Sequence, residues 1–217
     1  MMPSLHAAIA LVPIAMYLMM IGFLKLRTRP LMTTGWRDTL AIGIAVSGMM
    51  AVGPMELFFP TEAAAVWHHW VWAALAALYL LTLTLILLSC RPRLLAYGLD
   101  RQQFQSVLLT AAKTIDPQAF WQEQVLNIPA AGMQLAEEPT GSSSIHQVVS
   151  VGSYVNFSGW LDLERAFVQQ GANIRCARSY AGVPLILLGA ALMILSVAPL
   201  VAAPDIAQAQ LREFLSR

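Results

Sequence analysis

The sequence predicts an α-helical integral membrane protein with four transmembrane helices and a small inserted α+β domain of αββα order. Of the 217 residues, 58% are hydrophobic and 12% are charged, and the mean hydropathy is +0.62. These values lie outside the range that is usual for soluble domains. The apolar residues also gather in long runs, and a membrane helix needs about 20 such residues to cross about 30 Å of hydrocarbon.

Four apolar runs are long enough to cross a membrane, and they cover residues 5–24, 39–59, 66–89 and 181–203. The first run has no basic segment before it and no small-residue cleavage site after it, so we interpret it as a retained span rather than a signal peptide. The predicted organisation is therefore three spans, a soluble module, and a fourth span with a short tail, in residues 1–90, 91–180 and 181–217.

The positions of the basic residues predict the orientation, because Lys and Arg near span ends stay in the cytoplasm. The loop between the second and third spans holds Glu62 and no basic residue. Basic residues instead fill the first loop and both ends of the module, at Lys25, Arg27, Arg29, Arg37, Arg91, Arg93, Arg101, Arg175 and Arg178. We expect both termini to be extracytoplasmic and residues 91–180 to be cytoplasmic, in a bacterial-type inner membrane.

The inserted module shows two helix signals. Asp100 followed by Gln103 is typical of a capping box, and apolar residues then recur at helical spacing, which predicts a helix over 101–115. A second helix is expected from Ser158, ended by Gly171. Its apolar stripe consists of Trp160, Leu163 and Phe167.

Strand signals lie between these two helices. "EQVLNIP" and "GMQLAEE" predict one bent strand or a strand pair, and "IHQVVSVG" predicts the next strand. A short final strand near "NIRCA" is a further option.

The stretch "VWHHW" places His68 and His69 among tryptophans at the start of the third span. Tryptophan is typical of the membrane interface, and adjacent residues on a helix point about 100° apart, so the two histidines cannot both face one partner squarely. We therefore favour an interfacial belt. The alternative starts from His6 and Glu56, which are expected at the same outer depth. If the helices bring these groups together, His6, Glu56, His68 and His69 can hold a metal of unknown identity, ligate a haem, or relay protons to a quinol.

Small residues on the second span predict a helix-packing face formed by Gly43, Ser47 and Ala51. Whether this face packs within the bundle or against another subunit stays open. The spans carry no Asp, Glu, Lys or Arg at mid-depth, which disfavours ion-coupled transport.

No nucleotide-binding, metalloprotease or nucleophile-elbow motif occurs in the module, and His146 is interpreted as an ordinary surface residue. Cys90 and Cys176 form no CxxC pair, so neither a disulfide scaffold nor a structural zinc site is indicated. The net charge of +1 and the lack of basic runs exclude a nucleic-acid partner. We therefore expect no catalytic residues and no cofactor.

The leading hypothesis is a non-catalytic accessory, assembly or anchoring subunit of a larger inner-membrane complex, with the lipid bilayer and other membrane protein subunits as partners. The alternative is an electron-transfer or quinol-linked membrane protein with a haem or metal site at the outer face. A weaker alternative is a small-molecule channel or transporter.

Overall fold

The computed structural model describes residues 4–60, 66–67, 70–141, 144–151, 156–176 and 180–216. The chain divides into two compact units. The helical unit comprises Met1–Phe23, Thr39–Ser89 and Val183–Arg217, and the mixed unit comprises Leu24–Asp38 and Cys90–Gly182. The mixed unit thus contains the first loop as well as the inserted module.

The helical unit is built from long apolar helices. They are α1 (Ser4–Leu26), α2 (Gly35–Met50) with its continuation η1 (Ala51–Met55), α4 (Trp70–Ser89) and α7 (Gly182–Ala202). These four helices are long and apolar enough to cross a membrane by length and composition. The element η1 is a π-helix that contains Pro54. Proline has no N–H to donate, and a local change of helical pitch accommodates that loss.

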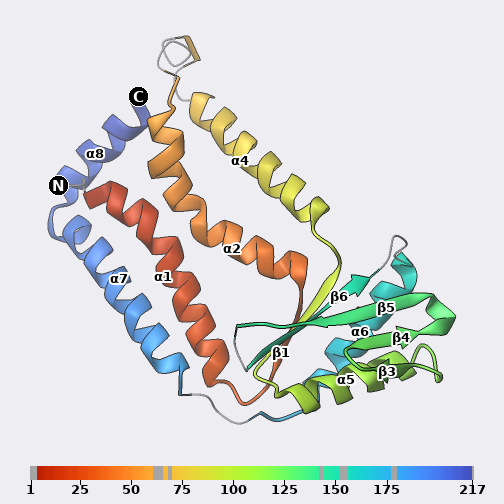
Figure 1. Ribbon diagram of the computed structural model, residues 1–217. Helices are drawn as coiled ribbons and strands as arrows, with labels where there is room; N and C mark the ends of the chain where they lie inside the picture. The colour runs from red at the N-terminus through yellow and green to blue at the C-terminus, as the bar shows by residue number, and fades with distance from the viewer. Residues whose placement is uncertain are drawn as a thin grey trace. The chain divides into compact units, whose positions relative to one another are not determined.

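Helix α1 lies between α7 and α2, and α4 lies beyond α2 (Figure 1). Glycines allow the backbones to approach closely on both sides of α1. A Cβ atom on Gly48 of α2 would lie 1.9 Å from the carbonyl oxygen of Ile9, and one on Gly189 of α7 would lie 2.8 Å from that of Ala15. Such glycine contacts are typical of membrane helix pairs, where dispersion forces replace the hydrophobic effect as the main attraction.

The residues after the fourth span, expected as a short tail, form helix α8 (Pro204–Ser216), which was not predicted from the sequence. Pro204 stands at the first helical position, where its fixed φ is favourable and its missing N–H costs nothing. Ala207, Gln210 and Phe214 recur at helical spacing and are its least exposed described side chains.

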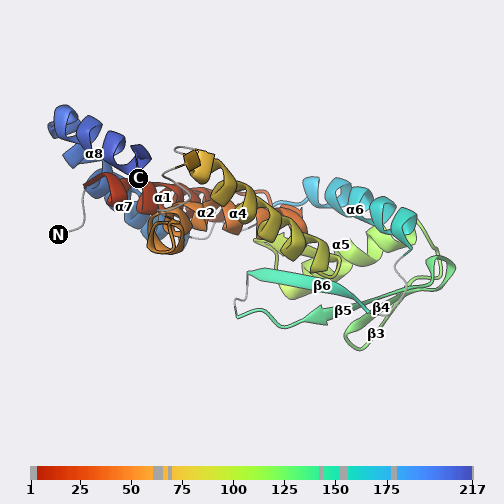
Figure 2. The same ribbon diagram turned by 90° about the horizontal axis from the view of Figure 1, so that it is seen from above.

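The mixed unit contains a six-stranded antiparallel sheet of order β1-β2-β6-β5-β4-β3. The strands are β1 (Leu31–Thr34), β2 (Arg93–Tyr97), β3 (Phe120–Gln122), β4 (Val125–Ile128), β5 (Met133–Glu138) and β6 (Ile145–Val151). Helices α5 (Arg101–Lys113) and α6 (Phe157–Ala172) lie on one face of the sheet (Figure 2). One apolar core between the helices and the sheet holds this unit together.

The expected αββα order is wrong, because β2 precedes α5 and four strands, β3 to β6, lie between α5 and α6. Strand β1 comes from the first loop and pairs Leu31 with Tyr97 of β2. It was missed because four residues carry no readable alternation, and β2 was missed because its apolar residues follow closely after the third span. The strand pair at "EQVLNIP" and "GMQLAEE" is confirmed as β4 and β5, which pair Val125 with Ala136. The optional strand near "NIRCA" is wrong over its described part, where residues 174–176 form no strand.

The capping box is confirmed. The Asp100 carboxylate accepts from the Gln103 amide at 2.7 Å, and the Asp100 amide donates to the Gln103 side chain at 3.4 Å. The stripe of α6 is buried in the core, as predicted. Gly171 does not end this helix, which continues to Ala172. A Cβ atom on Gly171 would lie 2.4 Å from the Met32 side chain, so glycine is needed at this position for close packing of α6 on β1.

We expect Gly48→Ala to lower the free energy of unfolding by about 1–3 kcal/mol, because the new methyl group meets a backbone carbonyl that cannot rotate away. Unfolding in mixed micelles, followed by circular dichroism, measures this change. Gly53→Ala is the matched control, since a Cβ atom at Gly53 has no atom within 4 Å. Equal stability of the two variants would contradict the close contact between α1 and α2.

Candidate functional site

His6 and Glu56 come together in the helical unit. The Nε2 atom of His6 lies 3.1 Å from Oε1 and 3.0 Å from Oε2 of Glu56. His6 lies in the first turns of α1, and Glu56 directly follows η1. Their side chains are only 13% and 18% exposed, so the contact is largely shielded from competing water. The structure therefore joins two of the four residues predicted for the outer site.

Helix α8 closes over this pair. The ring of Phe214 meets His6 edge-on at 5.4 Å between centroids and stacks on Trp72 of α4 at 4.4 Å. The side-chain oxygen of Gln210 accepts hydrogen bonds from the Ser4 hydroxyl and the Leu5 amide, both at 3.1 Å. A helix leaves its first amides without partners, so Gln210 supplies to α1 a cap from another part of the chain.

In the described part of the chain, two polar atoms around the His6 and Glu56 pair remain free to bind a ligand. Nδ1 of His6 and Nε1 of Trp72 are buried without a hydrogen-bond partner among the described residues. When Nε2 donates to Glu56, Nδ1 carries a lone pair that can accept a proton or a hydrogen bond, or bind one metal coordination position. The arrangement thus offers a single imidazole nitrogen and a carboxylate.

His68 and His69 lie outside the described residues. Within the described ranges, no group of three or more His, Cys, Asp or Glu side chains is placed to hold a metal ion. The haem and metal assignments of the outer site therefore stay predictions.

The predicted packing face on the second span separates into different contacts. Gly43 faces α4, because its carbonyl accepts from the Tyr79 hydroxyl at 2.6 Å and its Cβ position would lie 2.6 Å from Leu83. Ser47 donates to the Ile44 carbonyl of its own helix at 2.8 Å. Ala51 lies in η1 and is half-buried. The glycine that faces α1 is Gly48, which was missed because it stands outside the four-residue repeat that starts at Gly43.

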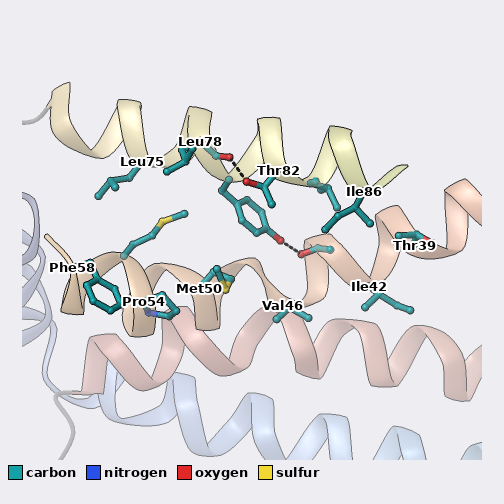
Figure 3. Close-up of a pocket in the computed structure, with 14 residues that line it drawn as sticks. Thr39, Ile42, Val46, Met50, Pro54, Phe58, Leu75, Leu78, Thr82 and Ile86 are labelled. Atoms are coloured by element: carbon teal, nitrogen blue, oxygen red, sulfur yellow. Dashed lines mark hydrogen bonds between the residues drawn. The ribbon is translucent and has the colours of Figure 1, made fainter. Parts of the chain in front are cut away.

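An apolar groove of about 500 Å³ runs between α2 and α4 (Figure 3). Apolar side chains of both helices line it, including Ile42, Val46, Met50, Leu75, Leu78 and Ile86. The hydroxyl of Thr82 donates to the carbonyl of Leu78, and the hydroxyl of Tyr79 donates to the carbonyl of Gly43. Because these hydroxyls are satisfied within the helices, the groove offers a dry surface that suits a hydrocarbon chain or an apolar helix.

A polar cavity of about 370 Å³ lies in the mixed unit beside the Glu137 carboxylate. Glu137 is only 8% exposed, and Arg101 donates to both of its oxygens at 3.1–3.2 Å, while Gln105 donates at 2.8 Å. Two residues one turn apart on α5 thus hold one carboxylate on β5. This arrangement pins the start of α5 to the sheet with charge-assisted hydrogen bonds.

His146 borders the same cavity and is not the ordinary surface residue that we expected. Its side chain is 12% exposed, its ring stacks on Phe104, and its Nδ1 lies 3.9 Å from Glu137. The register of β6 against β2, which sets His146 opposite Ala96, turns the ring toward the helices. No sequence signal predicts that register, so neither the ring contact nor the Glu137 clamp was predictable.

Cys90 and Cys176 are free thiols. Partial burial raises the pKa of the Cys176 thiol, and the negative charge of Asp100 raises it further. A raised pKa lowers the thiolate fraction at neutral pH and makes this thiol a poor nucleophile.

Comparison with known proteins finds no matching family, no similar curated protein and no similar solved structure.

We expect Phe214→Ala to release α8, because it removes the ring that joins His6 to Trp72. Amide hydrogen exchange over residues 204–216 should accelerate about a hundredfold or more, since truncating a buried Phe costs about 3–5 kcal/mol. Leu211→Ala on the same helix is the control, because Leu211 is 44% exposed. Equal acceleration in both variants would show that Phe214 does not anchor α8.

We expect Cys176 to react slowly with iodoacetamide at pH 8 in a Cys90→Ala background. Its rate should rise with pH along a curve displaced above that of free cysteine, because burial and Asp100 raise its pKa. Asp100→Asn should shift the curve to lower pH while preserving α5, since Asn is also a good N-cap. An unshifted curve in Asp100→Asn would leave burial as the sole cause.

Proposed function

We propose that this chain is a non-catalytic integral membrane subunit that anchors or helps to assemble a larger inner-membrane complex. The groove between α2 and α4 carries this proposal. A neighbouring transmembrane helix that inserts a ridge of side chains there would bury apolar surface of both α2 and α4. The partner is therefore another membrane protein subunit with an apolar helix.

The distribution of charge supports a packing role over a transport role. In the four candidate spans, Asp, Glu, Lys and Arg occur only near the helix ends, at Lys25, Arg37 and Asp38. Ion-coupled transport normally uses such groups at mid-depth. In the mixed unit, the buried Glu137 is already bound by Arg101 and Gln105, which suits a structural carboxylate better than a general base.

The basic residues support an orientation with both termini extracytoplasmic and the mixed unit in the cytoplasm. They gather in the segments that join the spans to the mixed unit, where the positive-inside rule places cytoplasmic charge. The His6 and Glu56 pair then belongs to the outer face.

The decisive experiment is gentle extraction from the native membrane followed by native mass spectrometry. We expect a second polypeptide to accompany the chain. Leu78→Trp should reduce this association by about tenfold, because overpacking a contact costs about 1–3 kcal/mol. Leu81→Trp is the matched control, since Leu81 is on the same helix, is similarly exposed, and does not line the groove. Loss in both variants, or purification of the chain alone, would contradict the proposal.

A second candidate function is electron transfer or quinol chemistry at the outer face, and the pairing of His6 with Glu56 favours it. A quinol oxygen that donates to Nδ1 would use the buried nitrogen that lacks a partner. Bound quinone or a visible haem band in the purified protein, lost in His6→Ala and kept in Leu211→Ala, would support this function, because Leu211 lies on α8 and is 44% exposed. A colourless, quinone-free preparation would argue against it.

A further inference from the structure

Two segments that are far apart in the sequence lie side by side in the mixed unit, and we call this place the crossing. Helix α1 ends at Leu26, and the carbonyl of Thr28 then accepts a hydrogen bond from the Cys176 amide at 2.7 Å. Helix α7 begins shortly afterwards, at Gly182. The segment that leaves one candidate span thus lies beside the segment that leads into another.

Three arginines flank this crossing directly. Arg27 and Arg29 stand on either side of Thr28, and Arg175 precedes Cys176. The lengths of extended chain and of one backbone hydrogen bond place their Cα atoms within roughly 10 Å of one another. All three residues are exposed, and in the described part of the chain none has a carboxylate partner within ion-pair distance.

The charges around the crossing are mainly positive. Lys25 lies in the last turn of α1 and adds a fourth cation. Asp100 is the acidic group close enough to act on Cys176, and its carboxylate is bound to the amide of Gln103. One carboxylate does not balance these four cations, so mutual repulsion remains among the arginines, and an anion would relieve it.

We propose that Arg27, Arg29 and Arg175 form a binding site for the phosphate of an anionic phospholipid. Guanidinium groups present planar pairs of N–H donors that match phosphate oxygens. The site directly follows the end of an apolar helix. The end of a membrane-spanning helix lies at the depth of the lipid headgroups. The proposal rests on the membrane location stated under the proposed function, but it does not depend on a protein partner.

The test uses the full chain purified in detergent and titrated with phosphatidylglycerol, with phosphatidylcholine as the comparison lipid, in native mass spectrometry. We expect preferential binding of phosphatidylglycerol. Arg27→Gln, Arg29→Gln and Arg175→Gln combined should weaken that binding by roughly a hundredfold, because each basic residue near anionic lipid contributes about 1 kcal/mol. The control combines Lys113→Gln, Arg165→Gln and Arg212→Gln, which remove the same charge elsewhere.

Equal losses in the two triple variants would show diffuse attraction and overturn the site, as would equal binding of both lipids. Inorganic phosphate that binds without lipid, and displaces phosphatidylglycerol at millimolar concentration, would identify a soluble phosphate compound instead and overturn the lipid assignment. If the triple variant fails to fold, each single variant should still weaken binding about fivefold. Unchanged binding in all three would overturn the site. The Leu78→Trp experiment measures association with a second polypeptide and not lipid binding. Failure of the subunit proposal can therefore be told apart from failure of the lipid site.

Discussion

The close backbone contacts of α1 are the constraint on which the helical unit depends. Without a hydrophobic force between helices in lipid, association relies on dispersion between surfaces that fit closely. Gly48 and Gly189 remove the side chains that would otherwise hold α2 and α7 away from the carbonyls of α1. Both ends of α1 lie beside polar groups, since His6 is in its first turns and Arg27 and Arg29 follow its last turn.

The apolar helices could be predicted from the sequence because length and hydropathy are local properties. The helix start at Asp100 was also predictable, since a capping box needs only residues near one another in the chain. Strand β1 could not be predicted in the same way. Its four residues form a strand only because β2, some sixty positions later, pairs with them, and only because Gly171 leaves room for Met32 under α6.

The candidate site was predictable only in part, for a similar reason. His6 and Glu56 were linked by an argument about depth, which uses span boundaries alone. The closing residues Gln210 and Phe214 lie about two hundred positions from the start of α1. Their role follows from the direction that α8 takes after Pro204, and helix periodicity alone does not specify that direction. The Glu137 clamp depends in the same way on strand register.

The pairing of His6 with Glu56 gives a physical reason for the position of α8. A buried polar contact adds little net stability, because desolvation offsets the attraction, whereas removing His6 would take one donor from the buried Glu56 carboxyl group, at a cost of about 1–3 kcal/mol. The pair therefore acts mainly by requiring that α1 and η1 meet at one position and that water be limited there. Phe214 limits water by covering His6, and Gln210 caps the Leu5 amide, which the same turn of α1 leaves open. The C-terminal helix thus completes a polar site that the spans alone would leave exposed to competing water.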